Sequence, residues 1–185
     1  ELLSCIASVY DSLSQYQKGL EYYEKALKIN REIGNRKEEA ECLMNIGVVY
    51  QDLSQYPRAL EYYKKGMEIA REIGDKAEET TCLGNLGGIY HRLSQYQKAL
   101  EYCRQAYELA KNAKDKRREG IWLGNMGSEY LALSQTEKAM ECYKESLQIA
   151  RETGSLQSEA IRLENMGMVY RNLSQYSEAI KYYDM

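Results

Sequence analysis

The sequence is poor in residues that interrupt helices. It contains one proline, one tryptophan and no phenylalanine in 185 residues, while 29% of its residues are charged. This composition favours helix, because proline breaks helices and the abundant Glu, Lys, Ala and Leu form them readily. No apolar run approaches the ~18 residues of a membrane span, and no signal peptide is apparent. We therefore expect a helical protein without a membrane partner.

The sequence also lacks the residue sets that carry most enzyme chemistry. His91 is the only histidine, so metal-ligand sets and histidine-based acid–base schemes have little support. No Ser-His-Asp or Cys-His arrangement is present. The run Gly84-x-x-Gly87-Gly88 lies inside a predicted helix and follows no strand, as a phosphate-binding loop must. We therefore expect neither an enzyme nor a bound metal or cofactor.

Charge and cysteine content narrow the partner classes and the compartment. The formal net charge is −3, and no basic face indicates nucleic-acid binding. There are five cysteines, Cys5, Cys42, Cys82, Cys103 and Cys142. Two of them occupy equivalent positions of neighbouring repeats, and equivalent points on packed helices lie ~10 Å apart, beyond the ~7 Å limit for a disulfide. Reduced thiols predict a cytoplasmic protein.

The dominant feature of the chain is a repeat of 40 residues without insertion or deletion. Five positions are identical in every repeat, namely Leu3, Tyr10, Leu13, Ser14 and Gln15 and the residues at 40-residue steps from them. A fixed period in this range is typical of solenoids, in which each unit contacts mainly its neighbours. We predict a single array over residues 1–185, with units 1–40, 41–80, 81–120, 121–160 and a truncated 161–185.

Each unit reads as two antiparallel helices. In the second unit, the apolar residues Leu43, Ile46, Gly47, Tyr50 and Leu53 recur at steps of 3, 1, 3 and 3, which places them on one face of a helix. A second amphipathic pattern follows, marked by Tyr56, Ala59, Leu60, Tyr63, Met67 and Ala70. Only the dipeptide at residues 54–55 separates the two patterns, so the helices must be antiparallel neighbours.

Capping signals mark the ends of these helices. Asn35 and Asp75 each precede a glutamate by three residues and predict caps of first helices. Ser14, Ser94 and Ser134 have the same relation to a Gln or Glu, and predict caps of second helices. Gly34, Gly74 and Gly154 follow second helices as left-handed C-caps. Lys114 replaces this glycine in the third unit, so we expect a less tightly closed linker there.

Small residues also recur inside the predicted helices. A column of glycine consists of Gly47, Gly87, Gly127 and Gly167, and a column of alanine of Ala59, Ala99, Ala139 and Ala179. A glycine inside a helix costs about 1 kcal/mol relative to alanine. Its recurrence in register therefore indicates that a neighbouring helix lies against bare backbone.

The residues Asn45-Ile46-Gly47, Tyr50, Tyr56, Ala59, Tyr63 and Gly66 follow the pattern of the tetratricopeptide repeat, and the whole chain resembles this family. The resemblance implies an all-α, right-handed α-solenoid of antiparallel helix pairs, with first helices on the concave face. The usual unit is shorter, ~34 residues. The longer unit is similar to the arrays of cortical polarity adaptors of the Pins/LGN type and, more loosely, of kinesin light chains.

An asparagine column is the sharpest functional feature of the predicted concave face. It consists of Asn45, Asn85, Asn125 and Asn165. A side-chain amide has two donors and an acceptor, so it can pair with the N–H and C=O of an extended peptide. The family resemblance implies this role for asparagine at this position. The alternative is that these amides brace the adjacent helices. Cys5 replaces asparagine in the first unit, so backbone capture should begin at the second.

The surroundings of this column suggest a partner with graded chemistry. Gly84, Gly88 and Gly124 should leave the floor open, and Ile121, Leu131 and Ala132 form an apolar patch, unless second-helix side chains cover it. The face also carries Met44, Ser128, Met168, His91, Arg92 and Arg171, whereas the first two units place Glu1, Asp11, Glu41 and Asp52 there. One interpretation is that the partner is basic toward the first repeats and acidic toward the later ones. The alternative is that these are scattered, solvated charges.

Three functions fit these patterns. The first is a protein–protein interaction scaffold or adaptor that binds an extended peptide in its concave groove. The second is a self-associating array. The chain begins in a first helix and ends in a second helix without a polar capping helix, so exposed end faces could stack end to end. The third is a sensor segment of a larger regulatory protein.

Overall fold

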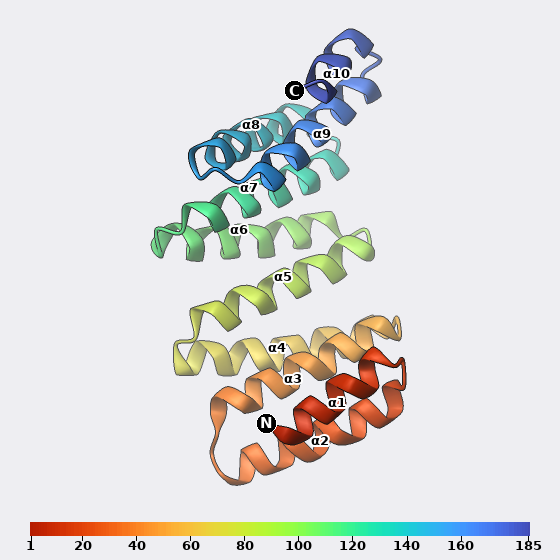
Figure 1. Ribbon diagram of the computed structural model, residues 1–185, viewed down its shortest axis with the longest axis vertical. Coiled ribbons are helices and arrows are strands. Elements are labelled where there is room, and N and C mark those ends of the chain that lie inside the picture. The colour runs from red at the N-terminus through yellow and green to blue at the C-terminus, as the bar shows by residue number, and fades with distance from the viewer. The chain divides into compact units, whose positions relative to one another are not determined.

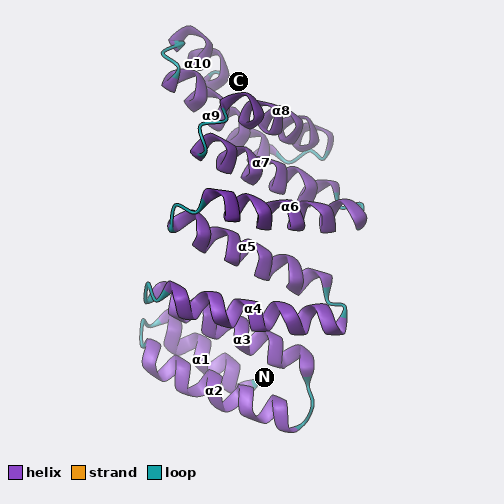
Figure 2. Cartoon of the chain, turned by 180° about the vertical axis from the view of Figure 1, so that it is seen from behind, coloured by secondary structure: helices purple, strands orange, loops and turns teal.

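The computed structural model describes all of residues 1–185 as ten helices without a strand, so the predicted all-α fold class is confirmed (Figures 1 and 2). The helices are α1 (Leu2–Ser12), α2 (Tyr16–Glu32), α3 (Arg36–Asp52), α4 (Tyr56–Ile73), α5 (Lys76–Arg92), α6 (Tyr96–Asn112), α7 (Lys116–Ala132), α8 (Thr136–Glu152), α9 (Leu156–Asn172) and α10 (Tyr176–Tyr183). No helix combines the length and the apolar content that a membrane crossing requires.

The chain forms two compact units, Glu1–Ile89 and Tyr90–Met185. Within the first unit, α1 packs on α2, α2 on α3 and α3 on α4. Within the second unit, each of the helices α6 to α9 likewise packs on the next one in sequence. Packing between sequence neighbours is the defining property of an α-solenoid, and the predicted antiparallel helix pairs are its building blocks.

The invariant tyrosine of each first helix explains much of the high tyrosine content. Its ring stacks on a tyrosine of the paired second helix in four of the five pairs, at centroid distances of 5.2–5.4 Å. Offset stacking of this kind adds about 0.5–1.5 kcal/mol beyond the burial of area. In the pair α7–α8, the second helix has Cys142 instead, and Arg104 donates a hydrogen bond to the Tyr130 hydroxyl at 2.6 Å.

The glycine column does provide bare backbone for a neighbouring helix. A Cβ atom placed on Gly47 would lie 2.7 Å from the ring of Tyr63 in α4, and one on Gly127 would lie 2.6 Å from the ring of Tyr143 in α8. Real Cβ atoms do not approach rings so closely. The tyrosine of the second helix therefore fills the volume that any other residue would occupy.

The turn between the two helices of a pair differs from the prediction. Ser54 has a left-handed backbone with φ of 57°. Its N–H bonds the carbonyl of Gln51, and the N–H of Gln55 bonds the carbonyl of Tyr50, each at 2.8 Å. This is a Schellman closure of the first helix. Ser14, Ser94, Ser134 and Ser174 have the same left-handed backbone.

The serines are therefore C-terminal closures of first helices, and the prediction that Ser14, Ser94 and Ser134 cap the second helices is wrong. The residue at each second-helix N-cap is the following glutamine, and no side chain caps these helices. The caps of first helices follow the prediction, because Asn35 and Asp75 accept hydrogen bonds from the N–H groups of Glu38 and Glu78.

The linker that contains Lys114 is as tightly closed as the others, contrary to expectation. Lys114 adopts a left-handed backbone with φ of 55°, where Gly74 has 73°. The N–H of Asp115 bonds the carbonyl of Ala110 at 2.9 Å, as the N–H of Asp75 bonds that of Ala70. Lysine therefore takes a conformation that costs a residue with a Cβ about 1–2 kcal/mol.

All five cysteines are free. Cys42, Cys82 and Cys103 are buried, and burial raises the pKa of Cys82 and of Cys103 to about 12. At neutral pH these thiols are protonated and behave as small apolar side chains.

Candidate functional site

The asparagine column lies at one register of the first helices. Asn45 is on α3 and Asn85 on α5 in the first unit, and Asn125 on α7 and Asn165 on α9 in the second. All four side chains are half-buried, and none forms a hydrogen bond with a protein group of its unit. A bracing role would use these amides in hydrogen bonds to neighbouring helices, and no such bond is present within either unit.

The face of the first unit around this column is open near its glycines. Met44 and Gly84 are half-buried, and Gly88 is exposed. A Cβ atom added to Gly88 would meet no atom within 4 Å. The space that the sequence predicts above Gly88 is therefore present.

The first unit also gathers carboxylates of like charge. Burial raises the pKa of Glu78, and the charges of Glu41 and Asp75 raise it further. Its Oε1 atom is buried without a hydrogen-bond partner. Burial likewise raises the pKa of Glu41, with Glu38 adding to the effect. The charge of Lys37 lowers both pKa values but does not offset the burial. A positively charged ligand would favour the ionised form of both carboxylates.

A second pair of carboxylates has the same character. Burial raises the pKa of Asp11, and the charge of Asp52 raises it further. The Oδ1 atom of Asp11 is buried without a partner. Sequence reasoning placed Asp11, Asp52 and Glu41 on this face but missed Glu78, which precedes the asparagine column by two helical turns. Its position as the third residue of a helix indicated only a capping role.

In the second unit, His91 is engaged with a buried acid. Its Nδ1 atom lies 2.9 Å and 3.0 Å from the two carboxylate oxygens of Glu129, and its ring meets Tyr96 edge-on at 5.3 Å. The His91 side chain remains 48% exposed, whereas that of Glu129 is 8% exposed. Arg92, the next residue of α5, and Arg171 of α9 are exposed.

The predicted apolar patch is only partly available. Ile121 is 37% exposed and Met168 is half-buried. Leu131, in contrast, packs against the core cluster that contains Tyr130, Tyr143 and Leu147. Second-helix side chains therefore cover Leu131, while Ile121 still faces solvent.

The largest difference from expectation concerns Gly124. We expected an open floor, but Gly124 is buried beneath the guanidinium group of Arg162 from α9. A Cβ atom on Gly124 would lie 2.6 Å from the Nε atom of Arg162 and closer to the rest of the group. Arg162 itself is 6% exposed. The glycine provides the space that the arginine occupies.

Two hydroxyl groups lie in the same region. The Ser128 hydroxyl donates to the Gly124 carbonyl at 3.3 Å and lies 3.1 Å from the Tyr143 hydroxyl. Gly124, Ser128, Tyr143 and Arg162 thus form one polar cluster of α7, α8 and α9. The sequence pointed to Gly124 and Ser128 alone, because the other two side chains come from positions that are apolar or aromatic in a typical unit.

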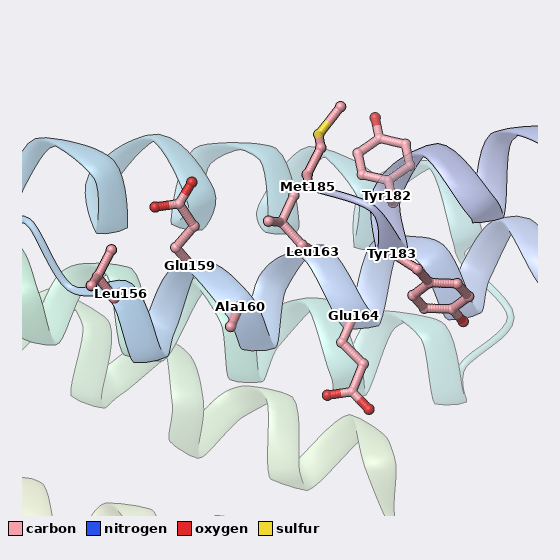
Figure 3. Close-up of a pocket in the computed structure, with 8 residues that line it drawn as sticks. All are labelled: Leu156, Glu159, Ala160, Leu163, Glu164, Tyr182, Tyr183 and Met185. Atoms are coloured by element: carbon pink, nitrogen blue, oxygen red, sulfur yellow. The ribbon is translucent and has the colours of Figure 1, made fainter.

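A pocket elsewhere in the second unit does not include the asparagine column. Figure 3 shows its lining residues on α9 and at the end of α10, namely Leu156, Glu159, Ala160, Leu163, Glu164, Tyr182, Tyr183 and Met185. In the preceding pair, Ser146 and Ile149 of α8 cover the equivalent stretch of α7, and Ser146 donates to the Gly120 carbonyl at 2.6 Å. Helix α8 has 17 residues and α10 has 8, so α10 leaves this stretch of α9 uncovered.

Comparison with family models agrees with the helix pairs. A model described as Tetratricopeptide repeat matches residues 1–72 and 78–152, and a second model with the same description matches residues 163–185. Among curated proteins, no sequence is significantly similar to this chain.

Several solved structures share the fold. BtubC (BKLC) from P. vanneervenii has a TM-score of 0.86 at 19% identity, with 98% of this chain and 76% of that chain covered. A candidate kinesin light chain from Podosopora anserina with nearly identical TPR-like repeats has a TM-score of 0.80 at 17% identity, with coverages of 98% and 90%. A Rap protein complexed with Competence and Sporulation Factor has a TM-score of 0.75 at 17% identity. The match covers 98% of this chain but 51% of the Rap chain, so this chain spans about half of its length.

Proposed function

Because this chain belongs to the tetratricopeptide repeat family, we propose that it is a protein-interaction scaffold whose asparagine-bearing face binds an extended peptide. The observation that carries the proposal is the column of four half-buried asparagines whose amides make no internal hydrogen bond. Such amides can pair with the main chain of a peptide whatever its side chains. The Rap structure solved with Competence and Sporulation Factor supports a ligand-binding role for this fold.

Charge gives the bound segment a direction. The first unit places Glu41 and Glu78 near its asparagines, with raised pKa values because burial and like charges oppose their ionisation. A lysine or arginine of the partner would relieve both effects. The cations Arg92 and Arg171 belong to the second unit, which also contains His91. The partner is therefore basic in the part that meets the first unit and acidic in the part that meets the second.

Selection from a random peptide library tests this proposal. The chain should enrich peptides, and the triple variant Asn85/Asn125/Asn165→Ala should bind them about a hundredfold more weakly, since each hydrogen bond contributes about 1 kcal/mol. The matched control is Asn112→Ala, an exposed asparagine on the second helix α6, which should leave the affinity unchanged. Failure to enrich any peptide, or unchanged affinity of the triple variant, would refute the proposal.

Reversal of charge tests the direction separately. A selected peptide should lose affinity when its basic and acidic ends are exchanged at constant composition. The loss should shrink at high salt, because ionic strength screens exposed charges. Equal affinities of the two peptides at low salt would show that charge does not orient the ligand.

A second candidate function is self-association. Several large apolar side chains of α1 and α10 are exposed, among them Leu2, Val9, Tyr176 and Ile180. Apolar surface of this kind favours contact between copies. Light scattering over a range of concentrations distinguishes the two functions, because a mass that stays monomeric at high concentration argues against assembly. The similarity to Pins/LGN-type adaptors remains a prediction.

A further inference from the structure

Arg162 is buried and has no partner in the protein. Its side chain forms no hydrogen bond or ion pair within the second unit, and its Nε atom is fully buried without an acceptor. A cation without a partner in such a place is unfavourable, because the cost of removing its charge from water is not offset. Burial accordingly lowers the pKa of Arg162, and the only nearby group that opposes this effect is Tyr143. Arginine nevertheless stays charged in proteins.

The fold does not need an arginine at this position. The equivalent residues in the three preceding 40-residue repeats are Cys42, Cys82 and Trp122, of which the two cysteines are buried. The repeat therefore accepts a small apolar or aromatic side chain here. Glycine at the position of Gly124 recurs in the third repeat as Gly84, whereas the first, second and fifth repeats have Ser4, Met44 and Glu164 there. Any side chain on residue 124 would displace the guanidinium group.

The cluster has the composition of an anion site. The terminal nitrogens of Arg162 differ from Nε in that they are not fully enclosed, and they offer donors in a planar fork that matches a carboxylate. The hydroxyls of Ser128 and Tyr143 lie 3.1 Å apart within the same cluster. Asn125 follows Gly124 directly, and Asn165 lies one helical turn after Arg162, so the asparagine column borders the cluster.

We propose that Arg162, held over Gly124, binds a carboxylate group of the peptide ligand. This inference rests on the proposed function and specifies the chemistry of the acidic part of the partner. The carboxylate is either a side chain or the end of a peptide chain. A phosphate fits less well, because one guanidinium with Glu164 nearby on α9 would have to neutralise a charge of about −2.

The substitution Arg162→Met tests the proposal. Peptides selected on the wild type should contain an Asp, a Glu or a free carboxyl end at a constant place, and should bind the variant at least tenfold more weakly, as expected for loss of a charge-assisted pair. The midpoint temperature of unfolding should rise, because a buried unpaired charge is replaced by an apolar side chain. A merely structural arginine would give the opposite shift and unchanged binding, which would overturn the inference.

A second variant guards against an indirect effect of Arg162→Met. Gly124→Ala keeps the arginine but pushes its guanidinium away, so binding should fall in the same way. Gly19→Ala on the second helix α2 is the matched control, because it adds the same Cβ atom away from the asparagine-bearing face, 3.4 Å from its nearest neighbour, the Ala7 carbonyl. It should bind the peptides like the wild type. If Gly124→Ala binds the acidic peptides as tightly as Gly19→Ala does, the position of the guanidinium is irrelevant and the inference fails.

Two further comparisons separate the sources of the carboxylate. Replacing the selected Asp or Glu by Asn or Gln abolishes the effect of Arg162→Met if a side chain is bound, and amidating the peptide does so if the chain end is bound. Selected peptides that lack any such group and bind Arg162→Met normally would refute the carboxylate site while the proposed function stands. The absence of any selected peptide would refute the proposed function itself.

Discussion

Two adjacent glutamates of α5 show how strongly local contacts decide the effect of a charge. Glu79 is buried, and burial alone would raise its pKa, but hydrogen bonds from Lys76 and Arg71 lower it below its ordinary value. Glu78 has no such partner and carries a raised pKa, because burial and the charges of Glu41 and Asp75 add together. One carboxylate therefore stabilises the fold in its charged form and the other opposes it.

This contrast predicts opposite responses of two neutral variants. Glu79→Gln should lower the stability at pH 7 by about 1–3 kcal/mol, the value of hydrogen bonds to a charged group. Its deficit should persist until the pH falls below 4.5, the ordinary value, because a lowered folded pKa gives stability that is lost only as pH falls through it. Thermal unfolding of both variants across this range measures the effect.

Glu78→Gln should instead raise the midpoint temperature at pH 7. A raised folded pKa means that the native state takes up its proton more readily than the unfolded chain, so the penalty of the charge disappears as pH falls toward 4.5. The variant and the wild type should converge over that window. A loss of stability in Glu78→Gln at pH 7 would show that this carboxylate has a partner that compensates its burial.

At the residue scale, the sequence predicts which positions face the ligand but not what fills them. The spacing of the first helix places Gly124 and Asn125 on the same face. That Arg162 covers Gly124 could not be predicted, because the arginine belongs to the next 40-residue repeat and its long side chain reaches across to α7. Equivalent positions with cysteine or tryptophan give no warning of a cation.

At the scale of the element, the turns carry a removable strain. Three of the four linkers between successive 40-residue repeats place glycine in the left-handed region, and the fourth places Lys114 there. Lys114→Gly should stabilise the protein by about 1 kcal/mol, the steric cost of the left-handed conformation less the extra entropy of an unfolded glycine. Urea unfolding measures the gain, and Gly74→Lys should produce a loss of similar size. No change in either variant would contradict this assignment of strain.

The helices themselves were predictable from the sequence, whereas one class of helix end was not. The apolar spacing around Ile46 and Tyr50 and the caps at Asn35 and Asp75 locate the first helices. A serine three residues before Gln or Glu fits an N-cap equally well as it fits a left-handed residue that closes the preceding helix. At Ser14, Ser94 and Ser134 the second arrangement prevails, because two residues are too few to end one helix and separately cap the next.

At the scale of the whole molecule, contact between sequence neighbours predicts how damage spreads. Gly127→Ala would force a Cβ atom into the ring of Tyr143, and overpacking of this kind costs about 1–3 kcal/mol. Hydrogen exchange should show the largest loss of protection in α7 and α8, a smaller loss in α6 and α9, and least in α1 to α3. The control Gly88→Ala should retain protection throughout. Uniform loss along the chain would indicate global cooperativity instead.

The tryptophan of α7 has a spectroscopic consequence. Trp122 is the only tryptophan of the chain, whereas the 18 tyrosines are distributed over both units. Trp122 is half-buried and lies two residues before Gly124. Light absorbed selectively by the indole therefore excites a single fluorophore on α7, the helix that also carries Gly124 and Ser128. The protein carries an intrinsic optical probe in α7, so ligand arrival and local opening there can be followed without attaching a label.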